Sequence, residues 1–249
     1  MIQQIDTYLL PSLLNSSSET FLQSTAVVID ILRASSTMVT ALGQGATSIY
    51  PCLEVKEALQ IKAGLTDALV GGERGGKPID GFDCSNSPAD YSAERVRDRP
   101  VVFTTTNGTR ALSHVSDCQE VLIGSFLNLS ALCDQLQTRS HILLLCAGTN
   151  GMVTREDVLF AGAVADRLRA THPESVGNDQ TALARAAWKQ VEGMAGDVKL
   201  NLAESFKETL GGRNLLKLGY GDDFSRVADI DRYDIVPDWR REQGLIKVP

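Results

Sequence analysis

Histidine, aromatic residues and clusters of positive charge are scarce in this chain of 249 residues. Its three histidines show no metal-ligand spacing. The net charge is −7, and the sequence contains no run of lysine or arginine. A nucleic-acid-binding protein normally presents a basic face, so we exclude that class. No apolar run reaches the roughly 18 residues of a membrane span, and no signal peptide is evident. We expect a cytoplasmic protein without a membrane or nucleic-acid partner.

Several motifs of phosphate-handling enzymes are also missing. The five cysteines form no C-x-x-C pair, which is typical of reduced thiols in the cytosol. Residues 71–77 match the start of a P-loop, but Pro78 stands where the metal-binding hydroxyl belongs. A cysteine phosphatase would need arginine six residues after Cys146, and Met152 stands there. The sequence therefore contains neither a complete P-loop nor the loop of a cysteine phosphatase.

The sequence does contain apolar, β-branched runs that alternate with helical stretches, a pattern that predicts a layered α/β sheet. No repeat or persuasive domain boundary occurs, so we expect a single domain over residues 1–249. The predicted strands are 25–30, 46–51, 68–70, 101–104, 121–124 and 141–146. The main predicted helices are 35–43, 55–63, 156–168, 179–193 and 198–210, and residues 71–90 form a long loop.

Polar or glycine-rich residues follow five of these strands. Open α/β sheets bind ligands beyond the carboxyl ends of their strands, so the tails should converge on one site. The tails are Asp30, Gly71–Arg74, Thr104–Thr109, Ser125–Asn128 and Ala147–Thr149.

Asp30 and Arg33 stand at the first predicted strand-to-helix turn, where free backbone N–H groups favour anions. We consider both residues candidates for catalysis, whereas Ser35 and Ser36 have simple helix capping as an alternative. Glu73 and Arg74 add an acid and a base within a flexible glycine-rich loop, with a surface ion pair as the alternative. Asn86 contributes a small polar group further along the loop.

The tail after the fourth strand resembles an anion-binding nest, because glycine permits close approach and hydroxyl and amide groups donate hydrogen bonds. The alternative is a hydroxyl-rich turn that caps a helix. The candidate anion donors are Thr105, Thr106, Asn107, Gly108, Thr109 and, after a later strand, Gly148.

Glu156 and Asp157 place two acids just beyond the 141–146 strand, where they could bind a metal. Thr154 with Asp157 also fits a capping box, which needs no metal. A second acidic pair, Asp222 and Asp223, is a further candidate for metal binding, although paired surface acids are common.

Together these segments resemble the 2-phosphosulfolactate phosphatase family, and the resemblance covers most of the chain. It is carried by VVIDILRASSTMVTALGQGA, GGERGGKPIDGFDCSNSP, TTTNGTRAL, GSFLN and CAGTNGMVTREDVLFAG. The family has glycine where Ser85 stands. The resemblance implies a three-layer α/β/α sandwich around a mixed, largely parallel sheet. It also implies Mg²⁺-dependent hydrolysis of 2-phospho-3-sulfolactate, a step of coenzyme M biosynthesis.

Under this hypothesis Asp30 and one or more of Glu73, Glu156 and Asp157 hold Mg²⁺, which prefers oxygen ligands. Arg33 or Arg74 grips an anionic group of the small phosphate ester. A rival mechanism makes Asp30 a covalent nucleophile. Two other functions remain open, namely a phosphatase for another small ester and a non-catalytic binder of phosphorylated or sulfonated acids. The sequence also leaves a homo-oligomer open.

Overall fold

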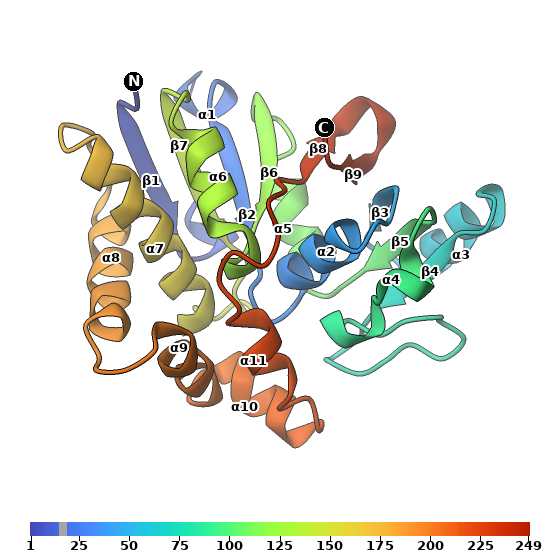
Figure 1. The fold of residues 1–249 in the computed structure, drawn as a ribbon. Helices are drawn as coiled ribbons and strands as arrows, with labels where there is room; N and C mark the ends of the chain where they lie inside the picture. The colour runs from blue at the N-terminus through green and yellow to red at the C-terminus, as the bar shows by residue number, and fades with distance from the viewer. Residues whose placement is uncertain (15–18) are drawn as a thin grey trace.

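The structure is a computed structural model that describes residues 1–14 and 19–249, and these residues contribute nine strands to one mixed sheet. The order of the strands is β1-β7-β2-β6-β8-β9-β3-β5-β4 (Figure 1). Their bounds are β1 (Gln4–Tyr8), β2 (Thr25–Ile29), β3 (Ser48–Cys52), β4 (Leu69–Gly72), β5 (Pro100–Thr104), β6 (Glu120–Gly124), β7 (His141–Cys146), β8 (Asp238–Arg240) and β9 (Leu245–Lys247).

Helices lie between most of these strands and over both faces of the sheet. They are α1 (Glu19–Leu22), α2 (Ala34–Gly43), α3 (Val55–Gly64), α4 (Ala93–Val96), α5 (Gly108–His114), α6 (Leu129–Leu136), α7 (Arg155–Thr171), α8 (Asp179–Glu192), α9 (Val198–Lys207), α10 (Leu210–Lys217) and α11 (Asp223–Val227). Short 3-10 helices are η1 (Pro11–Leu13), η2 (Pro88–Asp90), η3 (Phe126–Asn128) and η4 (Arg241–Gln243). None of the helices in the described ranges is long and apolar enough to cross a membrane.

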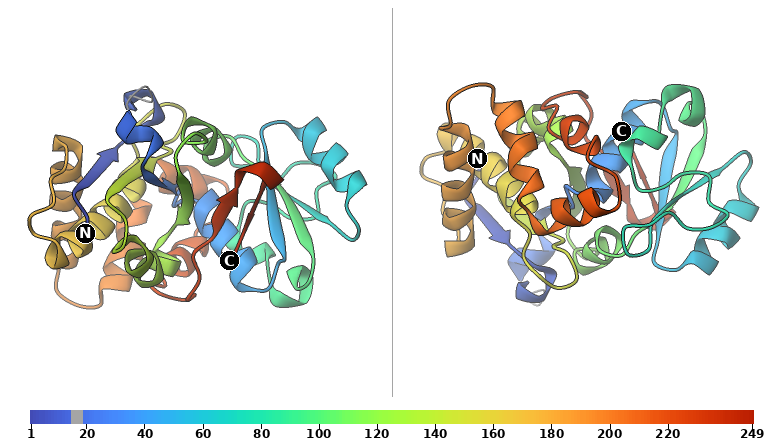
Figure 2. Two further views of the ribbon diagram at one scale, coloured as in Figure 1. Left: turned by 90° about the horizontal axis from the view of Figure 1, so that it is seen from above. Right: turned by 90° about the horizontal axis from the view of Figure 1, so that it is seen from below.

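The sheet consists of two parallel groups of strands. The first half-sheet is β1-β7-β2-β6 and the second half-sheet is β3-β5-β4. The antiparallel β8–β9 hairpin joins them, with Leu122 opposite Asp238 on one side and Ile49 opposite Ile246 on the other. Figure 2 shows this hairpin between the two groups. These short pairings join the two groups within the sheet, and the loops beyond their strands also meet, because the Asn150 N–H donates to Asn107 Oδ1.

Packing on both faces of β2 explains why its sequence is continuously apolar. Val27 and Ile29 join a core beneath the later helices of the chain, whereas Ala26 and Val28 join a core with α2 and α5. A strand covered on both faces reads as an apolar run rather than as an alternation. This arrangement confirms the predicted α/β fold with helices on both sides of a mixed, mostly parallel sheet.

Helix α2 begins beside the end of β2 and is buried along most of its length. Its N-cap is Arg33, which makes no side-chain capping bond. The capping alternative for the two serines was therefore wrong. The Ser35 hydroxyl donates to the Asp30 carbonyl, and the Ser36 hydroxyl donates to the Ile31 carbonyl. These bonds fix the turn that carries Asp30.

The six strands and five main helices predicted from the sequence are present, with ends shifted by a few residues. The loop predicted over residues 71–90 is shorter in the structure, because residues 71–72 belong to β4 and residues 88–90 form η2, while residues 73–87 form no helix or strand. No pattern in the sequence indicated β1, β8 or β9, which are short, or α10 and α11 as separate helices. The unpredicted hairpin is the element that joins the half-sheets.

Candidate active site

A cavity of about 340 Å³ lies where the tails of β2, β4, β5 and β7 approach helix α10. Figure 1 shows α10 and α11 at the end of the molecule towards which β2 runs. The residues that line the cavity are Asp30, Leu32, Arg33, Glu73, Gly75, Gly76, Asn86, Thr106, Asn107, Thr149, Asn150, Gly211, Asn214, Leu215, Lys217 and Leu218. Four of the five predicted strand-end tails thus meet at one place.

The fifth tail, Ser125–Asn128, has a structural role instead. Ser125 and Asn128 form a capping box, and the Asn128 amide donates to the carbonyls of Ile123 and Ile235. A larger cavity of about 830 Å³ lies at the opposite pole, near the amino ends of β2, β6 and β7. We do not place the active site there, because the buried acids and the glycine-rich tails lie at the smaller cavity.

Asp30 is the central acid of the cavity and is 8% exposed. Its Oδ1 atom accepts the Ala34 N–H at 3.2 Å, while Oδ2 accepts no hydrogen bond from the described residues. Gly108 packs so closely that a Cβ atom there would lie 2.9 Å from Oδ2. Burial raises the pKa of Asp30, and the negative charge of Asp157 raises it further. Asp30 is thus a carboxyl group that would gain from a nearby cation.

Asp157 and Glu156 lie behind Asp30 rather than in the cavity wall. Asp157 accepts the N–H groups of Ile31 and Gly148 at 2.8 and 3.0 Å. The Thr154 hydroxyl also donates to it, but as a side-chain contact and not as the helix cap that the capping-box alternative requires. Burial raises the pKa of Asp157, and the charge of Glu156 adds to this. Asp157 therefore ties the β2 and β7 tails together.

Glu156 carries a carboxyl group that is only partly satisfied. The side chain is 1% exposed, and its Oε2 atom has no hydrogen-bond partner among the described residues. Burial raises its pKa, and the charge of Asp30 also contributes, although contact with Thr209 lowers it. Three buried acids therefore stand close enough to repel one another, which is costly without a compensating cation.

Glu73 enters the cavity from the second half-sheet and organises the loops around it. Its Oε2 atom accepts the Gly76 N–H at 2.6 Å, and Oε1 accepts the Thr106 N–H at 2.7 Å. The carboxylate thereby joins the glycine-rich loop to the predicted anion nest. Within the nest, Thr106 and Asn107 line the cavity. Thr105 and Thr109 instead bond to each other near the start of α5.

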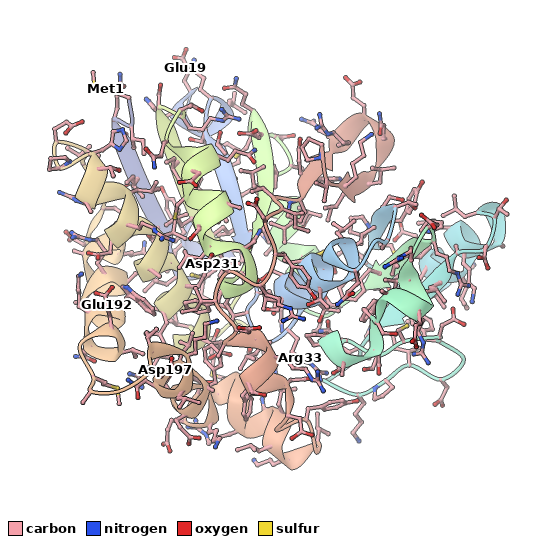
Figure 3. All side chains as sticks on the ribbon, in the orientation of Figure 1. Met1, Glu19, Arg33, Glu192, Asp197 and Asp231 are labelled. Atoms are coloured by element: carbon pink, nitrogen blue, oxygen red, sulfur yellow. The ribbon has the colours of Figure 1, made fainter. Side chains whose placement is uncertain are left out.

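The two candidate arginines have different environments. Arg33 lines the cavity and is 2% exposed. Arg74 is not part of the cavity wall, because its guanidinium donates to the carbonyls of Glu73 and Leu53 and to the Thr104 hydroxyl. Figure 3 labels Arg33 in the lower centre of the molecule, near α10 and α11. The structure therefore favours Arg33 over Arg74 as the anion-binding arginine.

Several lining residues were not among the predicted site residues. Thr149 and Asn150 follow a strand end whose polar tail was noted, so a signal for them existed. Asn214 and Lys217 lie on α10, where no motif pointed to the site. Lys217 forms no ion pair within the described residues. It offers a positive charge at the rim of the cavity, and only the packing of α10 reveals it.

The residues of the cavity fit a magnesium ion that is held by only a few protein oxygens. No group of three or more His, Cys, Asp or Glu side chains in residues 1–14 and 19–249 is arranged to hold a metal. Mg²⁺ at phosphoryl-transfer sites is, however, often held by one or two carboxylates, with waters and substrate oxygens completing the shell. Asp30 and Glu73 line the cavity, and Asn86 adds an Oδ1 atom without a partner among the described residues. This oxygen-only set suits Mg²⁺.

Comparison with known proteins gives a consistent result. A family model described as 2-phosphosulpholactate phosphatase matches residues 10–242. A protein of Thermotoga petrophila is 40% identical over 213 residues, which cover 86% of this chain and 88% of the relative. One of Caldanaerobacter subterraneus is 36% identical over 229 residues, 90% of each chain. Both relatives are named probable 2-phosphosulfolactate phosphatase.

Proposed function

The chain belongs to the 2-phosphosulfolactate phosphatase family, and we propose that it hydrolyses 2-phospho-3-sulfolactate to 3-sulfolactate and phosphate with the help of Mg²⁺. The observation that carries this proposal is the meeting of Asp30 and Glu73 with Arg33 and Lys217 in one cavity. The substrate carries three anionic groups, a phosphate, a carboxylate and a sulfonate. Its binding therefore requires positively charged side chains close to Asp30 and Glu73.

We assign to Asp30 the orientation of the attacking water, because this residue lines the cavity and its Oδ2 atom receives no hydrogen bond from the described residues. The water oxygen forms a bond to phosphorus, the bond from phosphorus to the substrate's C2 oxygen breaks, and that oxygen takes up a proton. Arg33, the Thr106 hydroxyl and the side-chain amide of Asn107 would hold the anionic oxygens. Donors placed where charge develops commonly give the largest catalytic contribution.

The proposed Mg²⁺ would be held by the carboxylates of Asp30 and Glu73 and by Asn86 Oδ1. When bound, it supplies positive charge that offsets the charge of the phosphoryl oxygens. Glu156 and Asp157 lie too far behind the wall to be counted as lining residues, and we assign them support of Asp30.

The decisive experiment measures phosphate release from a panel of esters, with Mg²⁺ and with excess EDTA. The panel contains 2-phosphosulfolactate, 2-phospholactate, phosphoglycerates and p-nitrophenyl phosphate. We expect rapid release from the sulfonated ester and its loss in EDTA. Release from another ester alone would keep the phosphatase and reject this substrate. Tight binding of an ester without any release would indicate the non-catalytic binder.

A separate measurement distinguishes direct attack by water from a covalent intermediate. Rapid quenching with ³²P-labelled substrate, followed by borohydride reduction and peptide mapping, detects an acyl phosphate on Asp30. We expect no such adduct if water attacks phosphorus directly. A labelled peptide that contains Asp30 would instead make this residue the nucleophile.

A further inference from the structure

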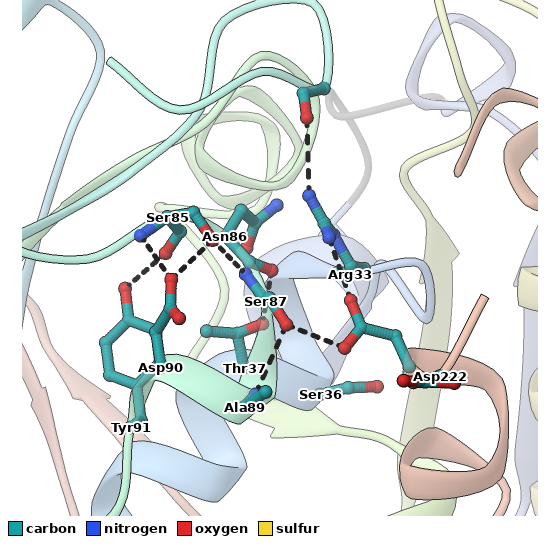
Figure 4. Close-up of polar contacts among 12 residues, drawn as sticks. Arg33, Ser36, Thr37, Ser85, Asn86, Ser87, Ala89, Asp90, Tyr91 and Asp222 are labelled. Atoms are coloured by element: carbon teal, nitrogen blue, oxygen red, sulfur yellow. Dashed lines mark hydrogen bonds and ion pairs between the residues drawn. The ribbon is translucent and has the colours of Figure 1, made fainter. Parts of the chain in front are cut away.

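Arg33 is held in the cavity wall by contacts from a distant part of the chain. Its Nη1 atom donates to Asp223 Oδ2 at 2.8 Å, although the two residues are 190 positions apart. The Cζ atom lies 4.0 Å from the centroid of the Tyr220 ring, and Nη2 reaches the Gly76 carbonyl at 3.4 Å. Figure 4 labels Arg33 and marks the two polar contacts of its guanidinium with dashed lines. Its plane and its direction are therefore both constrained.

Asp223 is constrained in the same way. It is 2% exposed, and its second oxygen, Oδ1, accepts the Ser87 hydroxyl at 2.6 Å. Ser87 belongs to the segment that also carries Asn86 into the cavity. Both oxygens of Asp223 are thus engaged, and neither Asp222 nor Asp223 lines the cavity that holds Asp30 and Glu73.

A buried ion pair is a poor means of stabilising a fold, because the desolvation of both charges offsets most of their attraction. A guanidinium has five N–H donors in a fixed plane, and two of its nitrogens are engaged by Asp223 and Gly76. Because these contacts fix the plane of the guanidinium, the directions of its remaining N–H donors are fixed as well. Such a fixed fork suits an anion with two oxygens.

We propose that Asp223 is a positioning residue, which acts with Tyr220 and Ser87 to orient the Arg33 guanidinium towards an anionic oxygen of the phosphate ester. The inference rests on the proposed function and deepens it. It gives residues 220–223, where the sequence suggested only a second acidic pair for a metal, the task of completing the anion site. A misplacement of about 1 Å at a catalytic group can cost about a hundredfold in rate, so the ion pair would affect turnover more than stability alone predicts.

The test compares Asp223→Asn, Arg33→Gln and the double variant, with Asp234→Asn as a matched control, because Asp234 is exposed and forms no salt bridge within the described residues. We expect Asp223→Asn to lower kcat/KM for 2-phosphosulfolactate by about a hundredfold. If Asp223 acts through Arg33, the double variant should lose no more activity than Arg33→Gln does alone. Losses that multiply in the double variant would overturn the proposal.

Two further measurements keep the test interpretable. Ser87→Ala removes only one hydroxyl from the network, so it should fold and show a smaller loss in the same direction. Asp223→Glu, which retains the charge, should recover part of the activity that Asp223→Asn loses. Wild-type activity in both Asp223→Asn and Ser87→Ala, with only their melting temperatures lowered, would reduce the pair to a structural role.

Binding of inorganic phosphate, measured by calorimetry, separates this inference from the proposed function. We expect Asp223→Asn and Arg33→Gln to weaken phosphate binding by similar factors, and the double variant to bind no more weakly. This result would support the positioning role even if the wild-type protein released no phosphate from any ester. Equal phosphate affinity in the wild type and in Asp223→Asn would overturn it, whatever the activity.

Discussion

The two half-sheets contribute different chemistry to the same cavity. The first half-sheet, β1-β7-β2-β6, is covered by the long helices α7 and α8 and supplies Asp30 with Glu156 and Asp157 behind it. The second half-sheet, β3-β5-β4, ends in glycine-rich loops and supplies backbone donors and Glu73. One side therefore concentrates buried acids with Arg33 beside them, whereas the other presents the hydroxyl and amide groups that would bind an anion.

The two half-sheets also differ in how the acids that they contribute to the cavity wall, Asp30 and Glu73, are hydrogen-bonded. Glu73 accepts two backbone N–H groups, one on each oxygen, and thereby organises the loops. Asp30 accepts one N–H on Oδ1 and keeps Oδ2 without a donor from the described residues. The engaged oxygens of Glu73 fix its position beside the cavity, whereas Asp30 Oδ2 is available to orient water. This difference favours Asp30, on the first half-sheet, over Glu73 as the carboxylate that would act in the reaction.

The largest expected effect comes from removing the reactive carboxylate. Asp30→Asn should lower kcat by about a thousandfold or more, because even one catalytic hydrogen-bond donor is commonly worth about a hundred- to a thousandfold. Steady-state kinetics with 2-phosphosulfolactate measures this. The exposed Asp134→Asn on α6 is the control and should retain full activity. A folded Asp30→Asn protein with normal turnover would break the assignment of the reaction to the first half-sheet.

A second prediction concerns the contact between the half-sheets. A Cβ atom on Gly108 would lie 2.6 Å from the Ala34 Cβ atom and 2.9 Å from Asp30 Oδ2. Gly108→Ala should destabilise the fold by about 1–3 kcal/mol, as overpacking commonly does, and should reduce activity as well. Urea unfolding measures the stability. Gly64→Ala, where nothing lies within 4 Å of the added Cβ, should leave both quantities nearly unchanged. Similar behaviour of the two variants would contradict the close approach.

The third prediction tests the anion-binding side. Thr106 Oγ1 is buried and has no hydrogen-bond partner among the described residues, so its hydroxyl could donate a hydrogen bond to a bound anion. Thr106→Val should raise KM about tenfold, which corresponds to the loss of one hydrogen bond of about 1.5 kcal/mol. The exposed Thr47→Val is the control. A lower kcat with an unchanged KM would place Thr106 in the reaction rather than in binding.

Lys217 gives a fourth, more selective prediction. If it pairs with the sulfonate, Lys217→Gln should lower kcat/KM several-fold for 2-phosphosulfolactate and much less for 2-phospholactate, which lacks that group. A charge pair at an exposed rim is commonly worth less than about 1 kcal/mol, so the effect should also shrink at high salt. Equal losses with both substrates would show that Lys217 contacts the phosphate or the carboxylate.

The smallest expected effect concerns the reactivity of the buried thiols. The rate at which each thiol is modified reports how readily its half-sheet unfolds locally. Burial raises the pKa of Cys133, which lies under the first half-sheet, to about 12, and that of Cys52, at the end of β3 in the second half-sheet, also to about 12. At pH 8 both should stay protonated and unreactive towards a thiol reagent, whereas unfolding restores the ordinary pKa of about 8.5. Mass spectrometry after timed labelling should find Cys52 modified before Cys133, because its core is small. The reverse order would contradict the weaker packing of the second half.

Much of this protein was determined by local sequence. The apolar run of β2 follows from burial on both faces, and the polar tails after β2, β4, β5 and β7 lie at the cavity as the pattern predicted. These features depend on neighbouring residues, whose periodicity and turn chemistry are visible along the chain. The same reasoning could not separate a functional tail from a structural one, and the Ser125–Asn128 tail caps its own turn.

Only the tertiary structure decided which polar groups act together. Arg33 and Arg74 have the same chemistry in similar loops, yet contacts with Asp223 and Tyr220 hold one in the cavity wall, while Leu53 and Thr104 hold the other away. Lys217 likewise enters the site through the packing of α10. Sequence periodicity describes residues within a few turns of one another. Partners that lie 190 residues apart are instead selected by the route of the chain and by the burial of charge.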